Sequence, residues 1–136
     1  VMDSKGSQSI TINTSPERVY NLLIDLGNLR EISPEFTRAE WLDGLTGPHA
    51  GARFMGYGAD GAPGVECRVL RAMPGDEWAI KTDLGSESPA TWRYELTHDG
   101  DACGLTLRWD APGRDPDAVA KAVAASLQAL KQRAEG

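Results

Sequence analysis

The sequence contains no long apolar segment. A membrane-spanning helix needs about 20 consecutive apolar residues, and no stretch of this 136-residue chain approaches that length. Its first residues also lack the positively charged segment followed by an apolar segment that marks a secretory signal peptide. These absences predict a soluble cytoplasmic protein that does not insert into membranes.

Positive charge is also scarce. The chain has 14 lysines and arginines against 20 aspartates and glutamates, which gives a net charge of −6. The basic residues form no cluster along the sequence. Because negative charge opposes contact with phosphate backbones and anionic lipids, we expect no nucleic-acid partner.

Cysteine and histidine are rare, with two of each. Cys67 and Cys103 allow at most one disulfide, and we predict that both are free thiols. His49 and His98 lie apart in the sequence and do not complete a zinc site with the cysteines, so we expect no metal and surface-exposed histidines. The sequence also lacks a nucleophile elbow, a phosphate-binding glycine loop and a paired-carboxylate motif. It therefore predicts no cofactor, identifies no catalytic residue and does not specify an oligomeric state.

The composition that remains is 40% hydrophobic and 25% charged, as in an ordinary globular domain. Residues 1–7 are polar and without periodicity, which predicts a flexible N-terminal segment. We expect residues 8–136 to form a single domain.

The longest regular element is a helix predicted over residues 115–135. Asp115 can cap its first turn, Pro116 fits the first helical position, and Gly136 follows the last turn. Its apolar residues recur at steps of four, four and three and form one stripe: Val119, Val123, Leu127 and Leu130. Alanines keep the flanks of this stripe thin, so a partner surface can approach closely or leave space beside it. A length of roughly 29 Å suits packing against a sheet.

A strand and two helices are predicted near the start of the chain. Ile10 and Ile12 alternate with polar residues, which predicts a strand over residues 8–13 with both isoleucines inward. A capped helix is expected over residues 15–27. A second short helix is expected over residues 28–32, before a Ser-Pro pair.

In the middle of the chain, apolar and polar residues alternate with period two in segments separated by turn residues, as in an antiparallel meander. Six strands are predicted there, over residues 37–42, 53–58, 65–73, 77–83, 90–98 and 104–110. With the first strand they make a seven-stranded antiparallel sheet of the α+β class, and only the C-terminal helix is long enough to cover one of its faces.

Five short segments and this order of elements resemble the START-related SRPBCC superfamily, in its polyketide cyclase/dehydrase-like branch. The segments are Ser-Pro-Glu-Arg-Val-Tyr at 15–20, Glu-Trp-Leu-Asp-Gly at 40–44, Gly-Ala-Arg-Phe at 51–54, Cys-Arg-Val at 67–69 and Trp-Arg-Tyr-Glu-Leu at 92–96. The resemblance implies a helix-grip fold, in which a curved sheet grips the C-terminal helix. It also implies a cavity between them that takes hydrophobic small molecules.

Such a cavity would be lined by the inward positions of the strands and by the helix stripe. The predicted ligand-binding residues are Phe54, Cys67, Trp78, Ile80, Thr82, Trp92, Tyr94, Trp109, Val119 and Val123. Gly56 and Gly58 would share the inner face with Phe54 and remove side-chain volume there. The competing interpretation is that these aromatic residues pack a filled core.

The strand over residues 65–73 allows two registers. Its apolar residues favour Cys67 inward, whereas a bulge would turn Glu66 and Arg68 inward instead. Some aromatase/cyclases that the chain resembles place an arginine in the pocket to polarise a carbonyl, and Arg68 is the nearest position here. The match assigns it no catalytic role.

Two functions follow from this fold. One is a cyclase/aromatase-like enzyme that confines a poly-β-keto chain and uses hydrogen-bond donors such as Tyr94 and Arg68. The alternative is a non-catalytic carrier, sensor or sequestering protein with the same pocket. In a third interpretation the cavity is filled and the surface serves a partner protein. Convergence of two or more titratable groups inside the cavity would favour the enzyme.

Overall fold

The computed structural model describes residues 3–28, 36, 38–42, 44, 48–58 and 64–136. Its elements are β1 (Asp3–Ile12), α1 (Pro16–Ile24), the 3₁₀ helix η1 (Leu26–Asn28), β2 (Arg38–Trp41), β3 (Arg53–Tyr57), β4 (Val65–Met73), β5 (Glu77–Thr82), β6 (Ala90–Asp99), β7 (Ala102–Pro112) and α3 (Pro116–Glu135). All seven predicted strands and the long C-terminal helix are present, so the α+β helix-grip prediction is confirmed.

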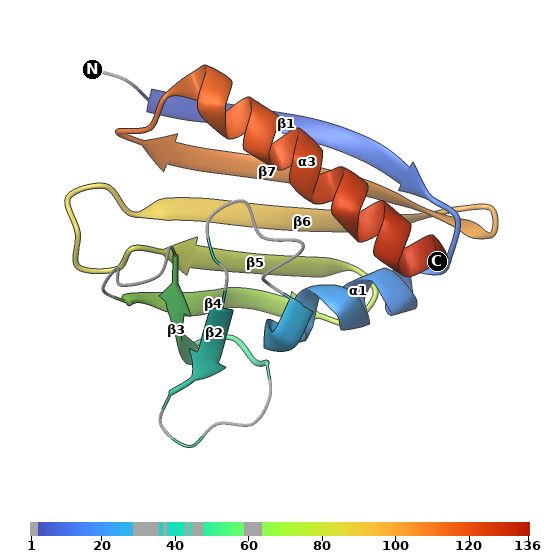
Figure 1. Ribbon diagram of the computed structural model, residues 1–136. Helices are drawn as coiled ribbons and strands as arrows, with labels where there is room; N and C mark the ends of the chain where they lie inside the picture. The colour runs from blue at the N-terminus through green and yellow to red at the C-terminus, as the bar shows by residue number, and fades with distance from the viewer. Residues whose placement is uncertain (1–2, 29–35, 37, 43, 45–47, 59–63) are drawn as a thin grey trace.

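The strands form one antiparallel sheet in the order β1-β7-β6-β5-β4-β3-β2. Consecutive strands from β2 to β7 are neighbours, as in a meander, and β1 joins the far edge beside β7. Helix α3 runs across one face of the sheet, over β1 and β7, and its C-terminal end lies beside α1 (Figure 1). We call the sheet face toward α3 the inner face and the opposite one the outer face.

Strand β1 begins at Asp3 instead of residue 8, so the prediction of a flexible N-terminal segment is wrong from residue 3 onward. Residues 3–7 pair with residues 108–112 of β7. The inner positions of this segment are Ser4 and Gly6, which carry no apolar side chain and so gave no strand pattern. A Cβ on Gly6 would lie 3.0 Å from the Trp109 ring, so a glycine allows this close approach.

The helix ends depart from the predictions in detail. Helix α1 starts as expected, with the Ser15 hydroxyl accepting the N–H of Arg18 at 3.2 Å, but it ends at Ile24 and not at residue 27. Of the predicted second short helix at 28–32, residues 29–32 lie outside the described residues, and η1 covers Leu26–Asn28. Asp115 is the N-cap of α3, but its side chain makes no capping hydrogen bond.

Helix α3 is fixed along β1 and α1. The predicted apolar stripe is buried, together with Ser126 and Ala134. Lys131 donates from Nζ to the carbonyl of Thr11 at 2.8 Å, and Arg18 of α1 donates from Nε to the carbonyl of Ala134 at 3.0 Å. Among the described elements, the closest backbone neighbours of α3 are β1 and α1, not the central strands β4 to β6.

Candidate functional site: the inner face of the sheet

The ten residues predicted to line a cavity all lie on the inner side of the fold. Each has 8% or less of its surface exposed; nine belong to one buried hydrophobic cluster, and the tenth, Thr82, is a buried polar residue. The register places Trp92 between Ile80 and Trp109, and the next inward residue, Tyr94, between Trp78 and Leu107. The alternation in the sequence therefore predicted which side chains face inward, and their contact with a ligand stays a prediction.

Two indole N–H groups in this cluster donate hydrogen bonds to side-chain hydroxyls. Trp92 donates from Nε1 to Thr82 Oγ1 at 3.1 Å, and Trp109 donates from Nε1 to Ser4 Oγ at 2.9 Å. Both hydrogen bonds are buried. An unpaired buried N–H is costly, so these hydroxyls stabilise the tryptophans where they lie.

Tyr20 of α1 belongs to the inner surface, and the sequence analysis missed it. Its ring meets Trp78 edge to face, with centroids 6.4 Å apart and an interplanar angle of 88°. Burial raises the pKa of the Tyr20 phenol, so the group is neutral and able to donate a hydrogen bond. Tyr20 shares the spacing of the buried residues Pro16, Val19 and Leu23, and this helical periodicity was the available signal.

The inner surface of β3 is filled rather than hollow. Phe54 is buried as predicted and meets Trp41 edge to face at 5.7 Å. At Gly56, however, an added Cβ would lie 3.0 Å from the ring of Phe36. The glycine therefore makes room for Phe36, which the sequence analysis did not place in the core, and the expectation of open space at this position is wrong.

Strand β4 keeps the register that buries Cys67. Glu66 and Arg68 lie on the outer face, where Glu66 Oε1 is 3.0 Å from Arg53 Nη1. The sheet does contain an irregularity, but it falls later in the strand, between Val69 and Arg71. Arg68 therefore does not enter the inner surface, and the bulge alternative is wrong.

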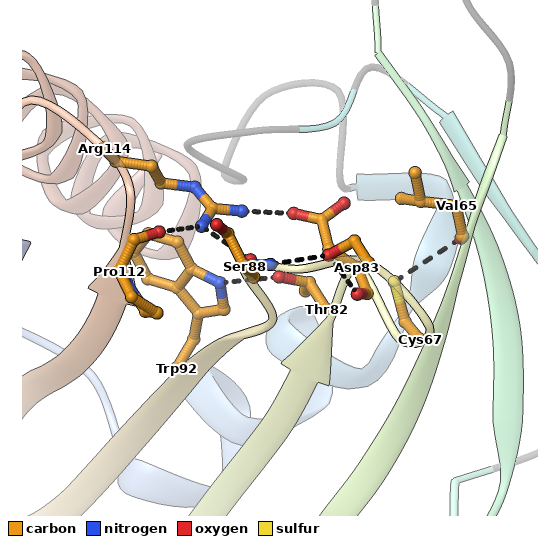
Figure 2. A network of polar contacts seen from close by, with 9 residues as sticks. Val65, Cys67, Thr82, Asp83, Ser88, Trp92, Pro112 and Arg114 are labelled. Atoms are coloured by element: carbon orange, nitrogen blue, oxygen red, sulfur yellow. Dashed lines mark hydrogen bonds and ion pairs between the residues drawn. The ribbon is translucent and has the colours of Figure 1, made fainter. Parts of the chain in front are cut away.

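A polar network closes one end of the inner face (Figure 2). Arg114, between β7 and α3, pairs with Asp83, which follows β5, and donates from Nη1 to the carbonyls of Ser88 at 3.1 Å and Pro112 at 3.2 Å. Asp83 is in the left-handed region with φ 57°, which turns the chain directly after β5. The network holds the β5–β6 loop against the start of α3, next to the Trp92–Thr82 hydrogen bond.

The buried part of the inner surface carries no charged side chain among the described residues. Its buried polar residues are Ser4, Asn28, Thr82 and Ser126, and its other polar groups are indoles, phenols, thiols and the half-buried amide of Gln8, which donates to the carbonyl of Ala120 at 3.0 Å. Cys67 and Cys103 are free and buried, and burial raises the pKa of the Cys103 thiol. His49 and His98 are exposed as expected, and no metal-binding group of His, Cys, Asp or Glu occurs among the described residues. The surface is therefore suited to apolar contacts and neutral hydrogen bonds.

A family model described as polyketide cyclase / dehydrase and lipid transport matches residues 4–135. The chain belongs to this family. The match runs from the second residue of β1 to the last residue of α3. No curated protein matches the sequence. None of the described helices is long and apolar enough to span a membrane.

Solved structures with similar folds come from several proteins. A START superfamily protein from Mycobacterium smegmatis aligns with a TM-score of 0.76 at 13% identity, covering 96% of this chain and 97% of that one. Ginseng major latex-like protein 151 from Panax ginseng aligns at 0.75 and 10% identity over 100% of both chains. The di-domain ARO/CYC StfQ from the steffimycin biosynthetic pathway aligns at 0.72 and 14% identity, covering 98% of this chain and 52% of that one. At such identities the likeness concerns the fold.

Proposed function

We propose that this protein binds a hydrophobic or aromatic small molecule between the inner face of its sheet and α3. The observation that carries the proposal is the chemistry of that face. Its described side chains are apolar or aromatic, with only neutral polar groups among them. An apolar ligand would gain roughly 25 cal/mol for each Å² of surface it buries there, and no described ionised group on this face would be desolvated by it.

The attachment of α3 supports the same proposal. The helix is tied to β1 and α1, whereas β4 to β6 carry Cys67, Trp78, Trp92 and Tyr94 on their inner side without a close backbone approach from α3. A ligand that displaced side chains at these central strands would leave the contacts of α3 with β1 and α1 in place. The family description includes lipid transport, which also concerns apolar cargo.

The second candidate is a cyclase/aromatase-like enzyme. The family description names cyclases and dehydrases, and the similar protein StfQ is a di-domain ARO/CYC. The phenols of Tyr20 and Tyr94 are the described inner groups best suited to donating a proton or a hydrogen bond to a carbonyl. Because no acid or base accompanies them among the described buried residues, we place ligand binding first and catalysis second.

The test of binding is a titration with an environment-sensitive apolar dye. We expect saturation near one equivalent and displacement of the dye by flat aromatic compounds. Urea-unfolded protein serves as the control for nonspecific dye binding. A folded protein that shows no saturable binding to a chemically broad panel of apolar compounds would contradict the proposal.

Tyr94→Phe locates the site and separates the two candidates. Removing the phenol oxygen should weaken binding by about 0.5–1.5 kcal/mol while the free energy of unfolding stays within about 1 kcal/mol of the parent. An enzyme that uses this phenol as a proton donor should also lose roughly 100-fold in turnover, with substrate binding little changed. Tyr57→Phe on the outer face is the matched control and should leave binding intact. A Tyr94→Phe protein that loses stability but binds normally would place the phenol in a structural role.

A further inference from the structure

The outer face of the sheet brings together cations that are far apart in the sequence. Arg53 of β3 lies directly opposite Arg68 of β4, and Arg68 lies directly opposite Lys81 of β5. Neighbouring strands are about 4.8 Å apart, so the three residues form a row roughly 10 Å long. We call Arg53, Arg68 and Lys81 the cationic row. Its residues alternate along their strands with the buried inner residues, so the row lies on the outer face.

Most other cations on the outer face have carboxylate partners, whereas Arg38 of β2 lies over the Tyr57 ring and Lys5 of β1 lies opposite Asp110. Glu77 pairs with both Arg71 and Arg93, and Glu95 pairs with Arg108. Arg53 is also paired, with Glu66. These ion pairs link adjacent strands.

Arg68 and Lys81 differ from these residues. Within the described part of the chain, neither side chain makes a hydrogen bond or an ion pair. Like charges directly opposite each other on neighbouring strands destabilise a sheet. Two adjacent cations without a partner among the described residues thus lie beside a third in a protein whose net charge is −6. A ligand carrying negative charge would relieve this repulsion.

We propose that the cationic row is a docking surface for an acidic segment of another protein. Charge complementarity selects the sign of the partner. The length of the row limits the kind of partner, because electrostatic attraction is screened beyond about 8 Å at physiological ionic strength. A compact group of carboxylates can match a row of this length, whereas an extended polyanion or a membrane surface would also meet the negative charge carried elsewhere on the molecule.

The test uses a fluorescent poly-L-glutamate peptide as the probe and measures binding by fluorescence anisotropy. We expect saturable binding that weakens as salt rises. The double variant Arg68→Glu/Lys81→Glu should raise the dissociation constant by at least about tenfold. The control Lys121→Glu/Arg133→Glu changes the net charge equally on the exposed side of α3 and should bind like the parent. Circular dichroism and dye binding on all three proteins check that each is folded.

Several results would overturn the proposal. An equal loss of peptide affinity in both double variants would show that net charge alone explains the binding. If the parent does not bind the peptide, the cationic row is not such a docking surface. Tighter binding of duplex DNA or of phosphatidylserine vesicles through Arg68 and Lys81 would assign the row to a different partner. Self-association that the Arg68→Glu/Lys81→Glu variant abolishes would identify a second copy of this chain as the occupant. Dye binding to the inner face is measured separately, so failure here leaves that result standing.

Discussion

At the residue scale, hydroxyl groups fix the tryptophans of the inner face. Thr82 and Ser4 accept the buried indole N–H groups of Trp92 and Trp109, at 3.1 and 2.9 Å. Each hydroxyl occupies a buried position where a purely apolar side chain would leave a donor unpaired. The polar residues inside this sheet are therefore specified by the neighbouring indoles.

The substitution Thr82→Val tests this dependence. Valine keeps the shape of threonine but cannot accept the Trp92 N–H, so we expect a loss of about 1–3 kcal/mol in the free energy of unfolding. In a Trp92→Phe background the same change should cost much less, because no indole N–H then needs an acceptor. Urea unfolding of the four proteins measures the coupling. Equal costs in both backgrounds would mean that the hydroxyl does not act through the indole.

Glu135 gives the protein a pH-dependent contribution to stability. Its carboxylate accepts the backbone N–H of Asn13 at 2.8 Å and pairs with Lys131 at 2.6 Å, and these two interactions lower the pKa of Glu135. A folded-state pKa below the unfolded value adds stability above the ordinary glutamate pKa, about 4.3. That contribution is lost as pH falls through the lowered folded-state pKa.

We expect Glu135→Gln to destabilise the protein at neutral pH, and the difference from the parent should shrink as the solution is acidified below the ordinary glutamate range. Urea unfolding across a pH series measures this difference. If the difference in free energy of unfolding between the two proteins stays constant with pH, the destabilisation comes from packing or geometry and not from the charge of Glu135.

At the scale of elements, the sheet has two chemically distinct faces. Inner positions of β3 to β7 are apolar or neutral, and the outer positions carry arginines, lysine and glutamates in cross-strand rows. Like charges also face each other in other rows, as Arg93 opposite Arg108 and Glu77 opposite Glu95, but these residues form ion pairs with residues of a neighbouring row. Among the described residues, Arg68 and Lys81 form no such pair in the cationic row. Its repulsion should therefore be measurable as lost stability.

Arg68→Glu should make the folded protein more stable. The change places a carboxylate between Arg53 and Lys81, so two like-charge cross-strand pairs become opposite-charge pairs, with an expected gain of about 0.5–2 kcal/mol. Arg71→Glu is the matched control on the same strand and should destabilise, because Arg71 pairs with Glu77 at 3.3 Å. Denaturant unfolding at low salt compares the three proteins. A less stable Arg68→Glu protein would show that Arg68 is not under repulsion.

At the scale of the whole molecule, the first strand completes the sheet by pairing with the last one. The register runs from Asp3 opposite Pro112 to Ile12 opposite Cys103. The N-terminal half of this pairing covers Trp109, and Ser4 accepts its indole N–H. Residues that carry no apolar pattern of their own therefore complete the core.

Deleting residues 1–7 should destabilise the protein by at least about 2 kcal/mol, from the exposure of an aromatic side chain and the loss of a buried hydrogen bond. Tryptophan fluorescence of the folded truncated protein should shift toward that of exposed indole. Ser4→Ala isolates the hydrogen bond and should cost about 1 kcal/mol. A truncated protein as stable as the parent would contradict a structural role for this end of β1.

The sequence alone determined the fold class and the orientation of most side chains. Strand alternation along β5, β6 and β7 and the apolar stripe of α3 are local patterns with fixed periods. They were enough to predict the inward positions of all ten candidate residues, from Phe54 to Val123. Buried Cys67 and exposed histidines followed from the same local reasoning.

Tertiary structure decided everything that depends on pairing between distant segments. The start of β1, the ring of Phe36 on Gly56, the ion pair of Asp83 with Arg114 and the alignment of Arg68 with Lys81 each join residues from different elements. Register between strands is set by the packing of the whole sheet, and a pattern within one strand does not specify it. For this reason a chain with no basic cluster in its sequence forms a row of three cations on its folded surface.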